Sequence, residues 1–80
     1  MVLEEAEFKI LEALYGDDFQ YIARNEDGQL YAFCEKPTKV EEEWESELYD
    51  RFLNLNYINV LFPNIKWEDD EPTSIERLLK

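Results

Sequence analysis

The sequence predicts an α+β fold: one small domain over residues 1–80, in which a small antiparallel sheet, a β-hairpin plus a third strand, is packed by helices in the order α-β-β-α-β-α. Three observations predict it. Apolar residues recur at helical spacing in two segments. Two strand-like stretches are joined by a tight turn, which requires an antiparallel pair. The composition is 45% hydrophobic and 15% aromatic, too apolar for a disordered acidic tail.

The first helix is predicted over residues 3–15. Glu5 and Lys9 form an i,i+4 pair in the favourable order, and Gly16 is a natural C-cap. The apolar face recurs every three or four residues and consists of Leu3, Ala6, Ile10, Ala13 and Leu14. This face predicts a helix that packs on the core.

The hairpin is predicted from strands at 19–24 and 29–35, joined by a turn at 25–28 that ends in a glycine. If Asn25 faces Gln29, alternation of side chains places two sets of residues on opposite faces. One set is Phe19, Tyr21, Tyr31 and Phe33, and the other is Ile22, Leu30, Ala32 and Cys34. Both sets are apolar, so we expect cover on both faces, with the first helix on one of them.

The segment 36–39, Lys-Pro-Thr-Lys, predicts a solvated loop. A second helix is predicted over 42–55 from an apolar stripe of Trp44, Leu48, Phe52 and Leu55. Beyond it, the apolar stretch 57–67 is interrupted by Pro63, which places the third strand at 64–67 with Ile65 and Trp67 on one face.

A short last helix is predicted after the charge run 68–71. Thr73 and Glu76 match the capping-box pattern, in which the first side chain accepts from the backbone and the second reaches back. The side chains expected to face inward from this helix are Ile75, Leu78 and Leu79.

The charge excludes several function classes. Twenty acidic and eight basic residues give a formal charge of −12, which argues against direct contact with nucleic acid or an anionic membrane. The chain has no histidine and one cysteine, Cys34, which argues against a zinc site and fits a reducing, cytoplasmic compartment. Two glycines are too few for a phosphate-binding loop. We therefore expect no metal, no cofactor and no enzymatic activity.

Several stretches resemble a group of small, uncharacterised acidic proteins encoded by phages and prophages of Gram-positive bacteria. These stretches are Tyr-Ile-Ala-Arg at 21–24, Asp-Gly-Gln-Leu-Tyr-Ala at 27–32, Glu-Lys-Pro at 35–37, the segment 65–75 and Leu-Leu-Lys at 78–80. The resemblance implies a phage origin, action in the host cytoplasm and no catalytic residue.

The acidic surface is the main functional signal. On the predicted second helix, Glu43 and Glu47 are i,i+4 neighbours and Asp50 follows three residues later, so their carboxylates form one ridge. Such a ridge would imitate the phosphates of DNA and occupy the basic groove of a nucleic-acid-binding enzyme of the host or phage. The candidate partner-binding residues are Glu43, Glu47, Asp50, Glu68, Asp69, Asp70 and Glu71.

Three other interpretations stay open at the level of sequence. One is an enzyme that uses a pair of carboxylates as acid and base, although so small a core leaves little room for the cleft it needs. The acidic charge is also what keeps a small protein in solution, without any partner. A chain of this size also gains stability by self-association, for which an uncovered aromatic face with Tyr21, Tyr31 and Phe33 would be the natural interface.

Overall fold

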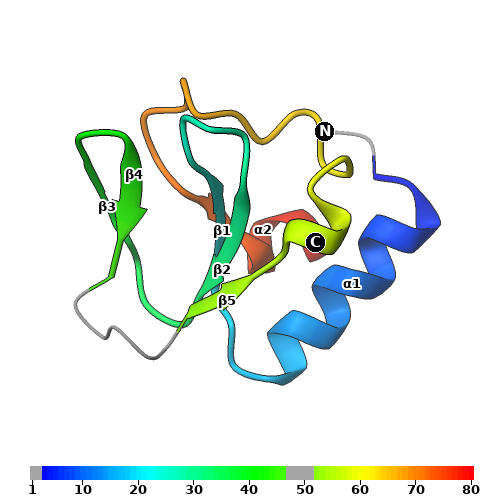
Figure 1. Cartoon of the computed structure of the whole chain (residues 1–80). Coiled ribbons are helices and arrows are strands. Elements are labelled where there is room, and N and C mark those ends of the chain that lie inside the picture. The colour runs from blue at the N-terminus through cyan, green and yellow to red at the C-terminus, as the bar shows by residue number, and fades with distance from the viewer. Residues whose placement is uncertain (1–2, 47–51) are drawn as a thin grey trace.

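A computed structural model describes residues 3–46 and 52–80. Within them, six strands form two antiparallel sheets, and the α+β class is confirmed. The larger sheet has the order β5-β2-β1-β6, and β3 pairs with β4 in the smaller one (Figure 1). The elements are α1 (Glu5–Gly16), β1 (Tyr21–Arg24), β2 (Leu30–Phe33), β3 (Thr38–Val40), β4 (Glu43–Glu45), β5 (Phe52–Asn54), a 3-10 turn (Asn56–Ile58), β6 (Thr73–Ser74) and α2 (Ile75–Leu79).

The β1–β2 hairpin has the predicted register, with Tyr21 opposite Phe33 and Ala23 opposite Tyr31. Asn25 N donates to Gln29 O at 2.9 Å, and Gly28 N donates to Asn25 O at 3.0 Å. Gly28 has φ 91°, a left-handed conformation that glycine adopts without steric cost. The turn chemistry alone therefore fixes which side chains reach each face.

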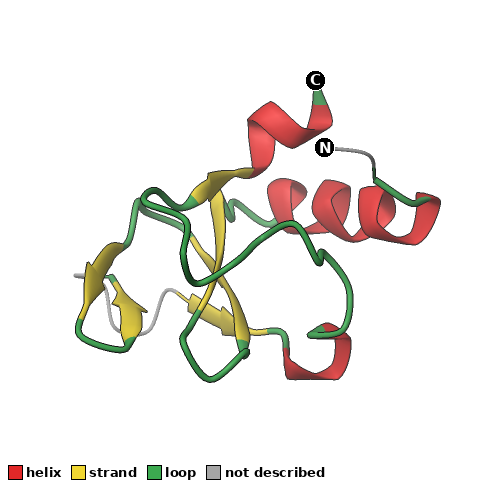
Figure 2. Ribbon diagram, turned by 90° about the horizontal axis from the view of Figure 1, so that it is seen from above, coloured by secondary structure: helices red, strands yellow, loops and turns green. Residues whose placement is uncertain are grey.

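Both faces of the larger sheet are covered, as alternation along the hairpin predicts. The α1 helix lies on one side of this sheet and the β3–β4 hairpin on the other (Figures 1 and 2). The main core, on the helix side, contains Leu11, Leu14, Ile22, Leu30, Ala32, Leu55, Phe62, Ile65 and Ile75. A second cluster of Ala23, Phe33 and Trp44 lies on the other side, with Tyr21, Tyr31 and Trp67 against it.

The ends of the predicted first helix and first strand need correction. The helix ends with Gly16, and Asp17 is the C-cap; the left-handed residue is Asp18, at φ 75°. Phe19 packs against the main core and not beside Tyr21. Because β1 begins only at Tyr21, strand alternation does not extend back to Phe19. The predicted Glu5–Lys9 pair is confirmed, at 3.2 Å.

The predicted helix over 42–55 is wrong for the residues that the structure describes, which include β4 and β5. Leu48, part of the predicted apolar stripe, lies outside the described residues. Trp44 is buried between exposed Glu43 and Glu45, which is the alternation of a strand. Phe52 pairs with Phe33 across β2. Long-range pairing with β2 and β3 overrides the helical spacing of the apolar residues.

The predicted third strand at 64–67 is also wrong, because this stretch forms turns. Ile65 lies in the main core and Trp67 in the second cluster, so they do not share a face. The places beside the hairpin are taken by β5 and β6. The carbonyl of Ile65 accepts from Arg24 Nε at 2.8 Å and not from a neighbouring strand.

The chain from 56 to 65 is held by two charged side chains. Arg24 donates to the carbonyls of residues 59, 61, 62 and 65 and of Gly28, at 2.7–3.2 Å. Burial lowers the pKa of the Arg24 guanidinium. The buried carboxylate of Glu7 accepts from Phe62 N at 2.5 Å and from Glu4 N at 3.0 Å. Phe62 is thus bound at both its N–H and its carbonyl, in a left-handed conformation at φ 57°.

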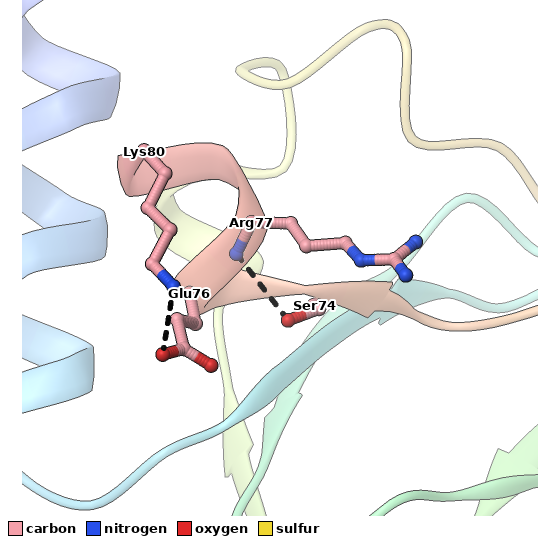
Figure 3. A network of polar contacts seen from close by, with 4 residues as sticks. All are labelled: Ser74, Glu76, Arg77 and Lys80. Carbon is pink, nitrogen blue, oxygen red and sulfur yellow. Dashed lines mark hydrogen bonds and ion pairs between the residues drawn. The ribbon is translucent and has the colours of Figure 1, made fainter.

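The last helix begins one residue later than its capping pattern predicts. Ser74 is the N-cap of α2, and its Oγ accepts from Arg77 N at 3.4 Å (Figure 3). Thr73 is paired with Ile22 in the sheet. Lys80 and Glu76 form an ion pair at 3.4 Å on the outer side. The predicted inward residues are confirmed, since Ile75 is fully buried and Leu78 and Leu79 pack against the main core.

Candidate protein-binding site

Carboxylates from two turns far apart in the sequence come together beside β4. Asn25 Oδ1 accepts from Trp44 N at 2.9 Å, and Glu26 N donates to Glu42 O at 3.1 Å. These bonds hold the β3–β4 turn against the β1–β2 turn. A shallow depression between the turns is lined by Asn25 and by the residues we call the acidic corner, Glu26, Asp27, Glu42 and Glu43.

The negative charge of the acidic corner is not neutralised within the described part of the chain. The ion pairs there join Lys9 to Glu5, Lys36 to Glu71 and Lys80 to Glu76, and none includes the acidic corner. The pKa of Glu43 is raised, first by a hydrogen bond with the Glu45 carboxyl, then by slight burial and by repulsion from Glu45 and Asp27. Glu43 therefore lies in a local excess of negative charge.

The predicted helical ridge of carboxylates is wrong for Glu43, which lies on β4. Glu47 and Asp50 lie outside the described residues. Regular spacing along a helix therefore does not organise the charge at Glu43. The neighbours that the structure gives it, Asp27 and Glu45, come from a turn and from the same strand.

The charge run 68–71 is partly used by the fold itself. Asp69 Oδ2 accepts from Lys66 N at 3.1 Å, and Glu71 forms an ion pair with Lys36 at 3.0 Å. Asp70 is exposed, and Glu68 lines a second depression together with Glu26. Among these four predicted site residues, Glu68 thus shares a surface with the acidic corner, while Asp69 and Glu71 bond within their own region.

Lys39 contradicts the prediction of a solvated loop at 36–39. It lies half-buried on β3, and its Nζ donates to Trp67 O at 2.6 Å and to Asp69 O at 2.8 Å. The ammonium also lies 4.2 Å from the ring centroid of Trp67 and 5.2 Å from that of Trp44. Lys39 therefore ties the smaller sheet to the 67–69 segment through contacts 28 and 30 residues apart in sequence.

Next to the acidic corner lies a cavity of about 280 Å³, open to solvent, which we call the aromatic groove. Tyr31, Phe33 and Phe52 lie with ring centroids 5.9–6.4 Å apart, and Phe52 is 46% exposed. The groove is lined by Tyr31, Phe33, Trp44 and Phe52, with Asn25, Glu43, Glu45 and Ser46 at its polar parts. The sequence predicts that Tyr31 and Phe33 share one face of the hairpin. It does not predict the groove, because the spacing of Phe52 fits a helix and not a strand beside them.

Among the described residues, no group of three or more acidic or cysteine side chains is placed to hold a metal ion. In the same part of the chain, no helix is long and apolar enough to cross a bilayer. No family model, curated protein or solved structure matches the chain. The site therefore has to be interpreted from its own chemistry.

Proposed function

We propose that this chain is a non-enzymatic accessory protein of a phage or prophage, which binds a basic host or phage protein through the acidic corner. The observation that carries the proposal is that these four carboxylates lie together without a cationic partner among the described residues. Clustered like charges repel one another and stabilise a fold only where they have partners. Asp27 has a structural role, since its Oδ1 accepts from Gln29 N at 3.0 Å, but the ion pairs of the described residues include none of the four carboxylates, which a basic partner would neutralise.

The negative charge also determines how fast such a partner would associate and how strongly the binding would depend on salt. A surface of one sign attracts an oppositely charged partner over long distances and raises the association rate, with strong dependence on salt. A formal charge of −12 on 80 residues gives this chain a strong attractive field for a basic protein. In its sharpest form, the proposal is DNA mimicry, in which the partner is a nucleic-acid-binding enzyme and the acidic corner occupies its basic groove.

The test is capture of partners from the cytosol of a Gram-positive bacterium at low and high salt, with mass spectrometry. The triple variant E26Q/E42Q/E43Q is compared with E12Q/D17N/E35Q, which removes the same charge from exposed positions elsewhere. Asp27 is left intact, because its Oδ1 accepts from Gln29 N at 3.0 Å.

We expect a basic protein that is captured at low salt, is lost at high salt and is lost in the triple variant only. A nucleic-acid enzyme among the captured proteins would support mimicry. Equal capture by the two triple variants would show that only net charge matters and would contradict the proposal.

A second candidate function is self-association, and the edge of the larger sheet favours it. β5 is one of the two edge strands of this sheet, with Phe52 46% and Leu53 42% exposed. Exposed apolar edge strands pair readily with other chains. Sedimentation equilibrium checks this: self-association predicts a mass above 9.7 kDa that rises with concentration, and L53K should restore the monomer.

A further inference from the structure

The aromatic groove has both an apolar wall and an anionic rim. Trp44 and Phe33 are buried beneath it, Tyr31 and Phe52 are partly open to solvent, and Glu43 and Glu45 stand on either side of Trp44 along β4. Building on the proposed function, we propose that this groove binds an arginine side chain of the protein partner. The guanidinium would lie on the aromatic rings and pair with the Glu43 and Glu45 carboxylates.

Charge complementarity is the first argument for a cation. Glu43 and Glu45 are two residues apart on one strand, so both side chains leave the same face and repel each other. The ion pairs of the described residues do not include either carboxylate. A guanidinium placed between them would replace repulsion by charge-assisted hydrogen bonds, which are about twice as strong as neutral ones.

The raised pKa of Glu43 supports this view. Its main cause is the hydrogen bond with Glu45, which stabilises the protonated form of Glu43. A cation at the same place would have the opposite effect and lower the pKa of Glu43.

The aromatic wall favours arginine over lysine. A guanidinium is planar and weakly hydrated and stacks on rings, whereas an ammonium is compact and strongly hydrated. Lys39 Nζ already lies over Trp67 and Trp44, so the rings open to a guanidinium in the groove are those of Tyr31 and Phe52. At about 280 Å³, the groove lies at the lower end of ligand clefts and suits one long side chain better than a cofactor.

The experiment titrates the ¹⁵N-labelled protein at low salt with the blocked pentapeptide Gly-Val-Arg-Val-Gly. Two matched peptides carry lysine or neutral citrulline in place of the arginine. We expect the largest shifts at the Trp44 indole N–H and at the amides of Tyr31, Phe33 and Phe52. Affinity should fall in the order arginine, lysine, citrulline, by about tenfold from first to last, or about 1.4 kcal/mol.

The variant E45Q/F52L removes one carboxylate and one exposed ring from the groove, and E12Q/F8L is its control on exposed positions of α1. We expect about tenfold weaker arginine-peptide binding in the first and none of this loss in the second. Equal binding of the citrulline peptide, shifts centred elsewhere, or unchanged binding by E45Q/F52L would overturn the inference.

These outcomes are separate from those of the proposed function. The groove variant keeps Glu26, Glu42 and Glu43, so it leaves the acidic corner whole. The acidic-corner variant keeps Glu45 and Phe52 but removes Glu43, which borders both surfaces, so the groove variant is the one that separates the two proposals. Salt-sensitive capture that depends on the acidic corner but survives E45Q/F52L would leave the proposed function standing while the arginine site fails. If both variants captured the partner as well as the unchanged protein does, the proposed function and the arginine site would both be contradicted.

Discussion

Two irregular regions of this molecule treat charge in opposite ways. In the loop from 56 to 65, Arg24 and Glu7 are enclosed by backbone groups that satisfy them. At the aromatic groove and the acidic corner, carboxylates face one another and solvent without a cation among the described residues. The contrast teaches that this fold encloses the charged groups that hold its longest loop, whereas the carboxylates of the acidic corner have no ion pair among the described residues and are open to another molecule.

The loop depends on Arg24 because one side chain reaches five carbonyls. All five guanidinium N–H positions are directed to backbone oxygens, four of them in the loop. A backbone without strand or helix partners satisfies its carbonyls through turns, side chains or water. Here Phe62 O accepts from Ile65 N in a turn, at 3.0 Å, and also from Arg24. The guanidinium therefore does for this loop what a neighbouring strand does elsewhere.

The largest predicted effect is that of R24M, which keeps much of the apolar stem and removes every donor. We expect it to lower the free energy of unfolding by about 3–5 kcal/mol, because five partly buried carbonyls lose the same charged donor at once. An 80-residue domain has only about 4–12 kcal/mol in total, so the variant should be close to unfolding. Urea denaturation followed by circular dichroism measures this loss.

The matched control is R77M, since Arg77 is exposed on α2. It should change the stability by no more than about 0.5 kcal/mol. If both variants were equally stable, the loop would be held by its apolar contacts, and the comparison of the two regions would fail.

The next effect is that of E7Q, which tests the other side chain on the loop. Both Glu7 oxygens accept from backbone N–H groups, of Glu4 and Phe62, so an amide must point its NH₂ group at one of these donors. We expect a loss of about 1–3 kcal/mol. E12Q, on the exposed side of the same helix, should leave the denaturation midpoint nearly unchanged; an equal shift in both would assign the effect to net charge.

The part of the fold that could be predicted from the sequence rests on local signals. The turn at 25–28 and the helical spacing in 5–16 fix the hairpin register and α1 within short stretches of chain. The spacing of Trp44 and Phe52 fits a helix, and only pairing with β3 and β2 makes them strand residues. Arg24 meets its loop 35–41 residues away, which no local pattern reveals.

The candidate site follows the same division. The sequence predicts Glu43 as a partner-binding residue, because it lies in a run of acidic residues. It predicts Asp27 only as part of a turn, and Phe52 as a core residue of a helix. Which carboxylates and rings meet depends on the pairing of β4 with β3 and of β5 with β2, and this pairing is tertiary information.

The smallest predicted effect on stability is that of E45Q, at the unmatched charges. The fold raises the pKa of Glu43, so protonated Glu43 is favoured by folding. That contribution is present at acidic pH, below the unfolded-state pKa, and is lost as pH rises through the folded-state pKa. Removing the Glu45 charge should therefore lower the pKa of Glu43 in a ¹³C carboxyl NMR titration and slightly raise Tm at neutral pH. An unchanged pKa in E45Q would show that the two carboxylates do not interact, and the anionic rim of the groove would lose its basis.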